Sequence, residues 1–158
     1  QIETAGTFVL PEAQLDRFML KINMGYPSPD DEMEIINKYY NSDPLDELEP
    51  VCARQDIIRM INEAGLVTAD DEVRRYIVKL VNETRNNSNI AIGASPRATL
   101  ALLSAAKANA YINGKTSCSS DDVKNIAVPV LAHRIKLKPK NLTGQLSSEE
   151  VINNIVWN

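Results

Sequence analysis

Arg97 has the type and position to act on a phosphate. It follows Ser95-Pro96 in the first turn of a helix predicted from Arg97 to about Ile112. The free N–H groups and the dipole of a helix N-terminus favour an anion and disfavour a fixed cation. An arginine in this turn is therefore useful when a phosphate arrives. An ion pair with a neighbouring Asp or Glu is the alternative interpretation.

Arg17 presents the same choice. It ends a short helical stretch predicted over residues 12–17, directly before a segment whose alternation predicts a strand. Its simplest role is an ion pair with Asp16 or Glu12, its aliphatic stem packed beneath the charge. Residue type and position alone leave a role in ligand chemistry open.

A phosphate-binding loop is not found in the sequence, although Gly114-Lys115-Thr116 resembles the end of one. The motif G-x-x-x-x-G-K-[ST] needs its first glycine where Asn109 stands, and it needs a strand before it rather than a helix end. No apolar run ends in paired acids that could bind magnesium. We therefore expect the chain to lack both the phosphate cradle and the magnesium site of a P-loop ATPase.

Metal and disulfide chemistry is not indicated. The chain has two cysteines, Cys52 and Cys118, without C-x-x-C spacing, and one histidine, His133. This set supplies neither a zinc site nor a disulfide framework, and it fits a reducing, cytoplasmic setting.

The elements that position these residues are mainly helical. Capping residues and a 3.6-residue apolar period predict helices from residue 29 onward. They cover about residues 29–41, a short stretch around 57–61 ending at Gly65, 71–81, 97–112, 119–131 and a terminal turn after a capping box at 147–150. Residues 134–140 alternate apolar and basic side chains and should be extended. The fold class predicted for residues 29–158 is a bundle of five or six helices.

The first 28 residues follow a different pattern. Leu20, Ile22 and Met24 alternate as in a strand. A single strand is unstable because its backbone groups need a partner. We expect residues 1–28 to be the end of an α/β core whose other strands lie upstream, and the start of the chain to be an internal boundary.

Composition and charge narrow the function classes. Of 158 residues, 44% are hydrophobic and 24% are charged, and no apolar run approaches the roughly 18 residues of a membrane span. Residues 1–66 hold 13 acids and 5 bases, whereas residues 67–158 hold 8 acids and 12 bases. No dense Lys/Arg cluster is interleaved with aromatics, so nucleic acid binding is not supported.

Three segments carry a resemblance to a known family. Residues 6–18, G-T-F-V-L-P-E-A-Q-L-D-R-F, are similar to the G-T-x-x-L-P-E-A-Q-L-D-R-F stretch of the MoxR family of AAA+ ATPases. Residues 93–98, G-A-S-P-R-A, resemble its sensor-2 motif, and residues 130–134, V-L-A-H-R, resemble its lid motif V-L-x-H-R. The resemblance covers nearly the whole chain and is weakest over residues 42–66.

The resemblance implies a chaperone-like ATPase that forms a ring, usually a hexamer, and matures client complexes, often with a von Willebrand factor A domain partner. It implies that Arg17 is the arginine finger for the adjacent subunit and that Arg97 is the sensor-2 arginine for nucleotide in its own subunit. It makes residues 1–28 the end of the AAA+ core and residues 29–158 the helical lid domain. His133 would serve packing or capping rather than catalysis.

ATP and Mg²⁺ would be held mainly by family motifs that are not in the chain, so we expect ATPase activity of the intact protein and none of the chain alone. Two other functions stay open. One is a magnesium-chelatase-like AAA+ motor subunit, and the other is a non-enzymatic helical interaction module.

Overall fold

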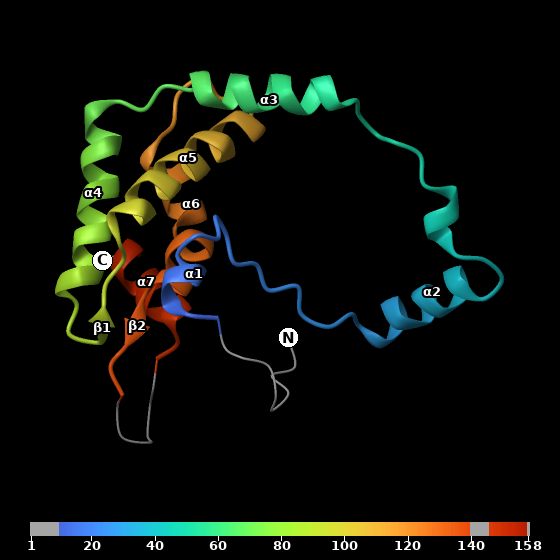
Figure 1. Ribbon diagram of the computed structural model, residues 1–158, viewed down its shortest axis with the longest axis horizontal. Coiled ribbons are helices and arrows are strands. Elements are labelled where there is room, and N and C mark those ends of the chain that lie inside the picture. Colours follow the sequence, from blue (N-terminus) through green and yellow to red (C-terminus); the bar gives the residue numbers. More distant parts are fainter. Residues whose placement is uncertain (1–9, 140–145, 158) are drawn as a thin grey trace. The chain divides into compact units, whose positions relative to one another are not determined.

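The computed structural model describes residues 10–139 and 146–157. The regular elements follow one another along the chain in Figure 1. They are α1 (Glu12–Leu15), α2 (Pro29–Tyr39), the 3-10 helix η1 (Pro44–Glu47), α3 (Arg54–Leu66), α4 (Asp71–Asn86), β1 (Ile90–Ile92), α5 (Pro96–Ile112), α6 (Ser120–Leu131), the 3-10 turn η2 (Ala132–Arg134), β2 (Lys136–Leu137) and α7 (Ser148–Trp157). The mainly α fold class is confirmed.

The described residues form two units. Those up to Lys21 pack with those from Glu63 onward, and Ile22–Asn62 form the other unit. The domain boundary expected at residue 28 stays a prediction.

The core of the first unit is a bundle of α4, α5, α6 and α7. Helix α5 buries a stripe of mostly small side chains, which lets α4 and α6 approach it closely. This stripe consists of Ala98, Ala101, Leu102, Ala105, Ala106 and Ala110. Leu100 and Ile112 of the same helix are 70% and 76% exposed, so α5 is central but not enclosed on every side.

Capping residues start the helices where the sequence predicts. Asp70 accepts a hydrogen bond from the Val73 amide at 2.8 Å and so caps α4. In front of α7, Ser147 and Glu150 form the reciprocal pair of a capping box, at 2.7 and 3.1 Å. These bonds satisfy backbone N–H groups that the first helical turn leaves unpaired.

No strand is found over residues 18–24 among the described residues, and its pairing with strands of an upstream core stays a prediction. The end of α6 bonds part of the segment: the Lys21 amide donates to the Pro129 carbonyl at 2.9 Å. The two short strands that do form, β1 and β2, pair antiparallel with Ile90 opposite Leu137. The extended stretch expected at 134–140 is therefore only partly observed, because Arg134 ends η2 and residue 140 lies outside the described residues.

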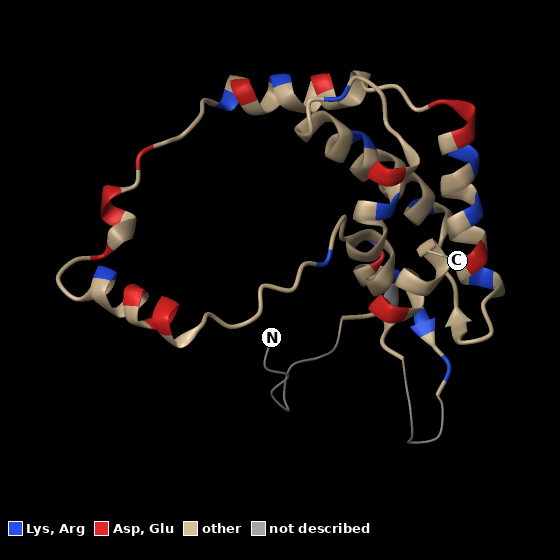
Figure 2. Ribbon diagram, turned by 180° about the vertical axis from the view of Figure 1, so that it is seen from behind, with Lys and Arg blue, Asp and Glu red and all other residues tan. Residues whose placement is uncertain are grey.

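The second unit has little core of its own. Neither α2 nor η1 contains a buried residue, and the apolar stripe Met33, Ile36 and Tyr40 is exposed. Helix α3, which leads out of this unit, also buries no residue. Acidic residues occur along α2 and η1 (Figure 2). Residues 29–158 thus contain six α-helices among the described residues, as predicted, but only α4 to α7 bury side chains in the core.

In the part of the chain that the structure describes, no helix combines the length and the apolar content needed to cross a membrane.

Candidate functional site

The start of α5 is fixed by a close contact with the end of α4. The Ala94 amide donates to the buried Thr84 hydroxyl at 3.0 Å, and Arg85 Nε donates to the Ala94 carbonyl at 2.9 Å. A Cβ atom at Gly93 would lie 2.6 Å from the Cα atom of Arg85, so only glycine fits here. This contact determines where Ser95-Pro96-Arg97 begins the helix.

Asp16 joins the segment after α1 to the same helix start. The Ser95 hydroxyl donates to the Asp16 carboxylate, whose oxygens lie 2.9 and 3.1 Å away. Ser95 is the N-cap residue of α5 but makes no side-chain cap bond. The Asp16 carboxylate therefore lies at a helix N-terminus, where the helix dipole stabilises negative charge.

Arg134 lies beneath this junction. Its side chain is 2% exposed, Nη2 donates to the Phe18 carbonyl at 2.6 Å, and Nε lies 3.9 Å from the Asp16 carboxylate. Nη1 is buried and has no hydrogen-bond partner among the described residues. Burial lowers the pKa of the Arg134 guanidinium, with the Asp16 charge opposing this and Arg97 adding to it. The guanidinium stays charged, because no protein environment readily deprotonates arginine.

His133 contacts the same carbonyl. Its Nε2 atom lies 3.0 Å from the Phe18 oxygen and 3.3 Å from Arg134 Nε, so whether it donates to the carbonyl or accepts from Arg134 depends on the tautomer. Burial lowers the pKa of His133, the Phe18 carbonyl acts in the opposite direction, and the charge of Arg134 lowers it further. The imidazole thus lies against the backbone of the segment that follows α1, and its packing or capping role stays a prediction.

The two arginines singled out in the sequence are both exposed. No ion pair of either Arg17 or Arg97 is found within the described residues. Asp16 is directed to Ser95 and Arg134 rather than to Arg17; the side chain of Glu12 lies outside the described residues. Arg17 directly follows Asp16, and Arg97 stands two residues after Ser95, so one hydrogen bond links the segments that carry both guanidinium groups.

Lys115 of the Gly114-Lys115-Thr116 segment has a structural role. Its Nζ atom lies 2.8 and 3.0 Å from the carboxylate oxygens of Asp122, which is 1% exposed. Asp122 also accepts from the Ser119 amide at 2.9 Å and so caps α6. Burial raises the pKa of Asp122, but the hydrogen bonds from Lys115 and Ser119 outweigh it, so the pKa is lowered overall. The resemblance to a phosphate loop is coincidental.

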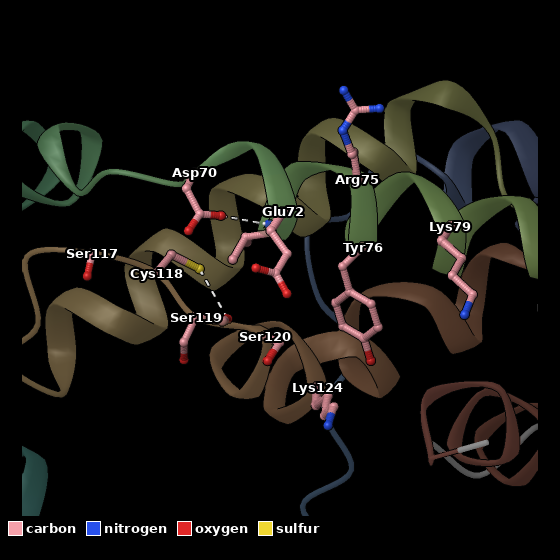
Figure 3. A pocket seen from close by; sticks show the side chains of 11 residues that line it. Asp70, Glu72, Arg75, Tyr76, Lys79, Ser117, Cys118, Ser119, Ser120 and Lys124 are labelled. Atoms are coloured by element: carbon pink, nitrogen blue, oxygen red, sulfur yellow. Dashed lines mark hydrogen bonds between the residues drawn. The ribbon is translucent and has the colours of Figure 1, made fainter.

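A cavity of about 810 Å³ opens between α4 and the start of α6 (Figure 3). Charges of both signs line it, among them Glu72, Lys79 and Lys124, and none of the arginines discussed above does. Burial raises the pKa of the Cys118 thiol at its edge, which disfavours the reactive thiolate. Within residues 10–139 and 146–157, no group of three or more His, Cys, Asp or Glu side chains is placed to hold a metal ion.

Sequence reasoning missed three residues of this junction: Asp16, Ser95 and Arg134. One feature of the sequence could have indicated them: each lies inside one of the three family-like segments, within two residues of Arg17, Arg97 or His133. Nothing in the sequence alone indicates that these segments, 79 to 118 residues apart, meet through Asp16 and Phe18.

Known proteins resemble the chain over nearly its whole length. A family model described as an AAA lid domain matches residues 82–155, which include Arg97 and Arg134. The chain is 38% identical over 155 residues to the uncharacterized protein YeaC of Bacillus subtilis, covering 98% of this chain and 48% of that protein. It is 35% identical over 164 residues to the chaperone MoxR1 of Mycobacterium tuberculosis, covering 98% of this chain and 43% of that protein.

A solved structure shows the same fold. A candidate ATPase from Cytophaga hutchinsonii matches with a TM-score of 0.87 and 32% identity, over 98% of this chain and 50% of that protein. The chain spans about half the length of the curated relatives it matches. Since the motifs, the lid-domain match and these relatives agree, the chain belongs to the MoxR family of AAA+ proteins.

Proposed function

We propose that the chain acts within a chaperone-like AAA+ ATPase, with Arg17 serving the nucleotide of a neighbouring subunit and Arg97 that of its own. One observation carries the proposal. Arg17 and Arg97 are exposed, have no ion pair among the described residues, and stand within two residues of Asp16 and Ser95, whose hydrogen bond lies at the N-terminus of α5. Exposed arginines on segments joined at a helix N-terminus suit a phosphate ligand.

The chemistry of such a site is electrostatic. Phosphoryl transfer gathers negative charge on the transferred group, and a positioned arginine stabilises that charge without bonding covalently. ATP and Mg²⁺ would be held mainly by residues outside this chain, because the sequence contains no phosphate loop. The proposal includes a ring, hexameric by analogy with the family, von Willebrand factor A domain proteins as partners, maturation of client complexes, and a cytoplasmic location.

The first test separates the two arginines in a protein that also carries the nucleotide-binding half. Arg17→Ala should reduce turnover by about 10³–10⁵-fold, because it removes charge stabilisation in the transition state. ATP affinity should stay near that of the wild type. Arg97→Ala should weaken ATP affinity as well, because this residue would contact bound nucleotide in both ground and transition states. Steady-state kinetics measure turnover, and titration with a non-hydrolysable ATP analogue measures affinity. Arg74→Met, which changes an exposed surface residue, is the control.

Mixed rings test the assignment in trans. An Arg17→Ala subunit keeps its phosphate cradle, and a cradle-defective subunit keeps its Arg17, so interfaces between them should regain activity. Normal hydrolysis by Arg17→Ala rings, or no recovery where mixed rings demonstrably form, would show that Arg17 does not act on the neighbouring site.

A helical interaction module without enzymatic activity is the second candidate. The exposed apolar stripe of α2, formed by Met33, Ile36 and Tyr40, favours it because unpartnered apolar surface marks interaction sites. The gene distinguishes the two candidates. A strand, a G-x-x-x-x-G-K-[ST] loop and a helix encoded before residue 1 support the ATPase, and their absence supports the module.

A further inference from the structure

The backbone that follows Arg17 is tied to the end of α6. The Phe18 carbonyl accepts a hydrogen bond from Arg134 Nη2 at 2.6 Å, and His133 Nε2 lies 3.0 Å from the same oxygen. Three residues later the Lys21 amide donates to the Pro129 carbonyl at 2.9 Å. The segment from Phe18 to Lys21 is thereby held against residues 129–134.

The residue before Arg17 is tied as well. Asp16 accepts from the Ser95 hydroxyl, and its carboxylate lies 3.9 Å from Arg134 Nε. Arg17 is therefore bracketed by two anchored neighbours, Asp16 and Phe18, while its own side chain is exposed. Arg134 contributes to both anchors, and it is the residue that connects them.

A purely stabilising role is a poor explanation for Arg134. Its side chain is 2% exposed, and one of its donors, Nη1, has no partner among the described residues. A buried charge with an unmatched donor carries a desolvation cost, and apolar side chains of similar volume often replace buried ionic groups without loss of stability. What an apolar residue cannot do is hold the Phe18 carbonyl and attract Asp16 together.

We propose that Arg134 is a positioning residue for Arg17, holding the Phe18 carbonyl and the Asp16 carboxylate so that the exposed guanidinium projects from a rigid turn. This inference rests on the proposed function of Arg17. Arg134 itself does not touch the nucleotide. Because Asp16 also binds Ser95, the turn that carries Arg17 and the helix that carries Arg97 are held as one body.

The test in the intact ring uses Arg134→Met, which keeps side-chain volume and removes the donors. Turnover should fall about 10²-fold, since small displacements of a catalytic group have effects of this size. KM should stay near that of the wild type, because Arg17 would act on the transition state rather than on bound ATP. Mixing with cradle-defective subunits should restore activity, as for Arg17→Ala. Arg134→Lys should recover part of the turnover through a single hydrogen bond to the Phe18 carbonyl.

Two controls define the specificity of this result. Arg74→Met removes an exposed arginine that pairs with Asp71 and should change neither quantity. Arg85→Met removes an arginine that also binds a backbone carbonyl, but at Ala94, so it should raise KM by disturbing Arg97. If Arg134→Met raises KM like Arg85→Met, or is not rescued in mixed rings, the positioning role is overturned.

The contacts that hold the segment from Phe18 to Lys21, here called the tie, can also be tested in the chain alone, without measuring ATPase activity. Amide exchange at Lys21 should accelerate about tenfold or more in Arg134→Met, since a hydrogen bond from a charged donor is lost nearby, while α5 keeps its protection. Should Arg134→Met fail to fold, Asp16→Asn, which keeps the shape but removes the charge, should produce the same turnover loss at unchanged KM. Unchanged exchange at Lys21 overturns the tie.

The two proposals fail in different ways. Normal turnover in Arg17→Ala rings rejects the proposed function, even when the exchange experiment confirms the tie. Slow turnover in Arg17→Ala with normal turnover in Arg134→Met rejects the inference alone.

Discussion

His133 is the only histidine in the chain, which makes its titration directly observable. Burial lowers its pKa from the usual 6.5 because the charged imidazolium loses hydration, and this effect exceeds the opposing effect of the Phe18 carbonyl. The folded protein therefore binds fewer protons at this site than the unfolded chain does. The resulting contribution to stability is complete above about pH 6.5 and is lost as the pH falls below that value.

We expect the imidazole C–H resonances of the folded chain to titrate with a midpoint below 6.5 in an NMR experiment. His133→Asn, which can still donate to the Phe18 carbonyl, should show a smaller loss of unfolding free energy than the wild type between pH 7 and pH 5. The carboxyl of Asp122 interferes little in this range, because its pKa is lowered from 3.8. A midpoint at or above 6.5 would contradict the burial of the imidazole.

At the scale of elements, the turn between β1 and α5 depends on one glycine. A methyl group at Gly93 would meet the Arg85 backbone at 2.6 Å, and backbone cannot rotate away as a side chain can. Gly93→Ala should lower the free energy of unfolding by about 1–3 kcal/mol, the usual range for overpacking. Urea denaturation measures this change. In the proposed ring the same variant should weaken ATP binding, because the contact positions Arg97, the residue that we propose contacts the nucleotide.

Gly65 supplies the matched control. It lies within α3, and nothing lies within 4 Å of a Cβ atom built there. Gly65→Ala should therefore be neutral or stabilise by up to about 1 kcal/mol, because alanine loses less backbone freedom in a helix. Equal losses in both variants would show that the turn at Gly93 is not specially constrained.

Interactions between residues close in sequence predict where the helices start, but they do not predict which distant segments pair. Ser28 and Asp70 each cap a helix as expected, since a cap depends on atoms only three residues apart. No strand is found around Leu20 among the described residues, because strand formation depends on a partner far away in the sequence. A strand needs a partner, and in this chain the Lys21 amide finds the Pro129 carbonyl, 108 residues away, instead. The contacts of Arg134 with Phe18 and Asp16 could not be predicted from the sequence, because they too join distant parts of the chain.

On the scale of the whole molecule, burial differs between the two units. Ile77, Leu80 and Leu102 of α4 and α5 are at most 2% exposed, whereas α2 buries no side chain. The spacing of Met33, Ile36 and Tyr40 places three apolar side chains on one face of α2, but all three are exposed in the structure. Periodicity shows that a helix has an apolar face, and only tertiary contacts show whether that face is used.

This difference predicts a contrast in amide exchange for the isolated chain. An isolated helix of 11 residues is marginal in water, because packing supplies most helix stability in proteins. Amides of α2 should therefore exchange rapidly, through local opening of that helix. Amides of α4 and α5 should exchange only through unfolding of the core. Hydrogen exchange read by mass spectrometry or NMR, over a range of protein concentrations, measures both.

Concentration distinguishes the explanations if α2 proves protected. Protection that grows with concentration would mean that a second copy covers Met33, Ile36 and Tyr40. If α2 is protected as strongly as α4 at every concentration, the predicted difference in exchange between them is wrong, because such protection would require α2 to be packed within the same chain. Met33→Glu sharpens the test, since a charge on an uncovered face should leave the unfolding free energy of the core unchanged. The matched change at Val73 of α4, Val73→Glu, places a charge at a position that is 6% exposed and should destabilise the core strongly.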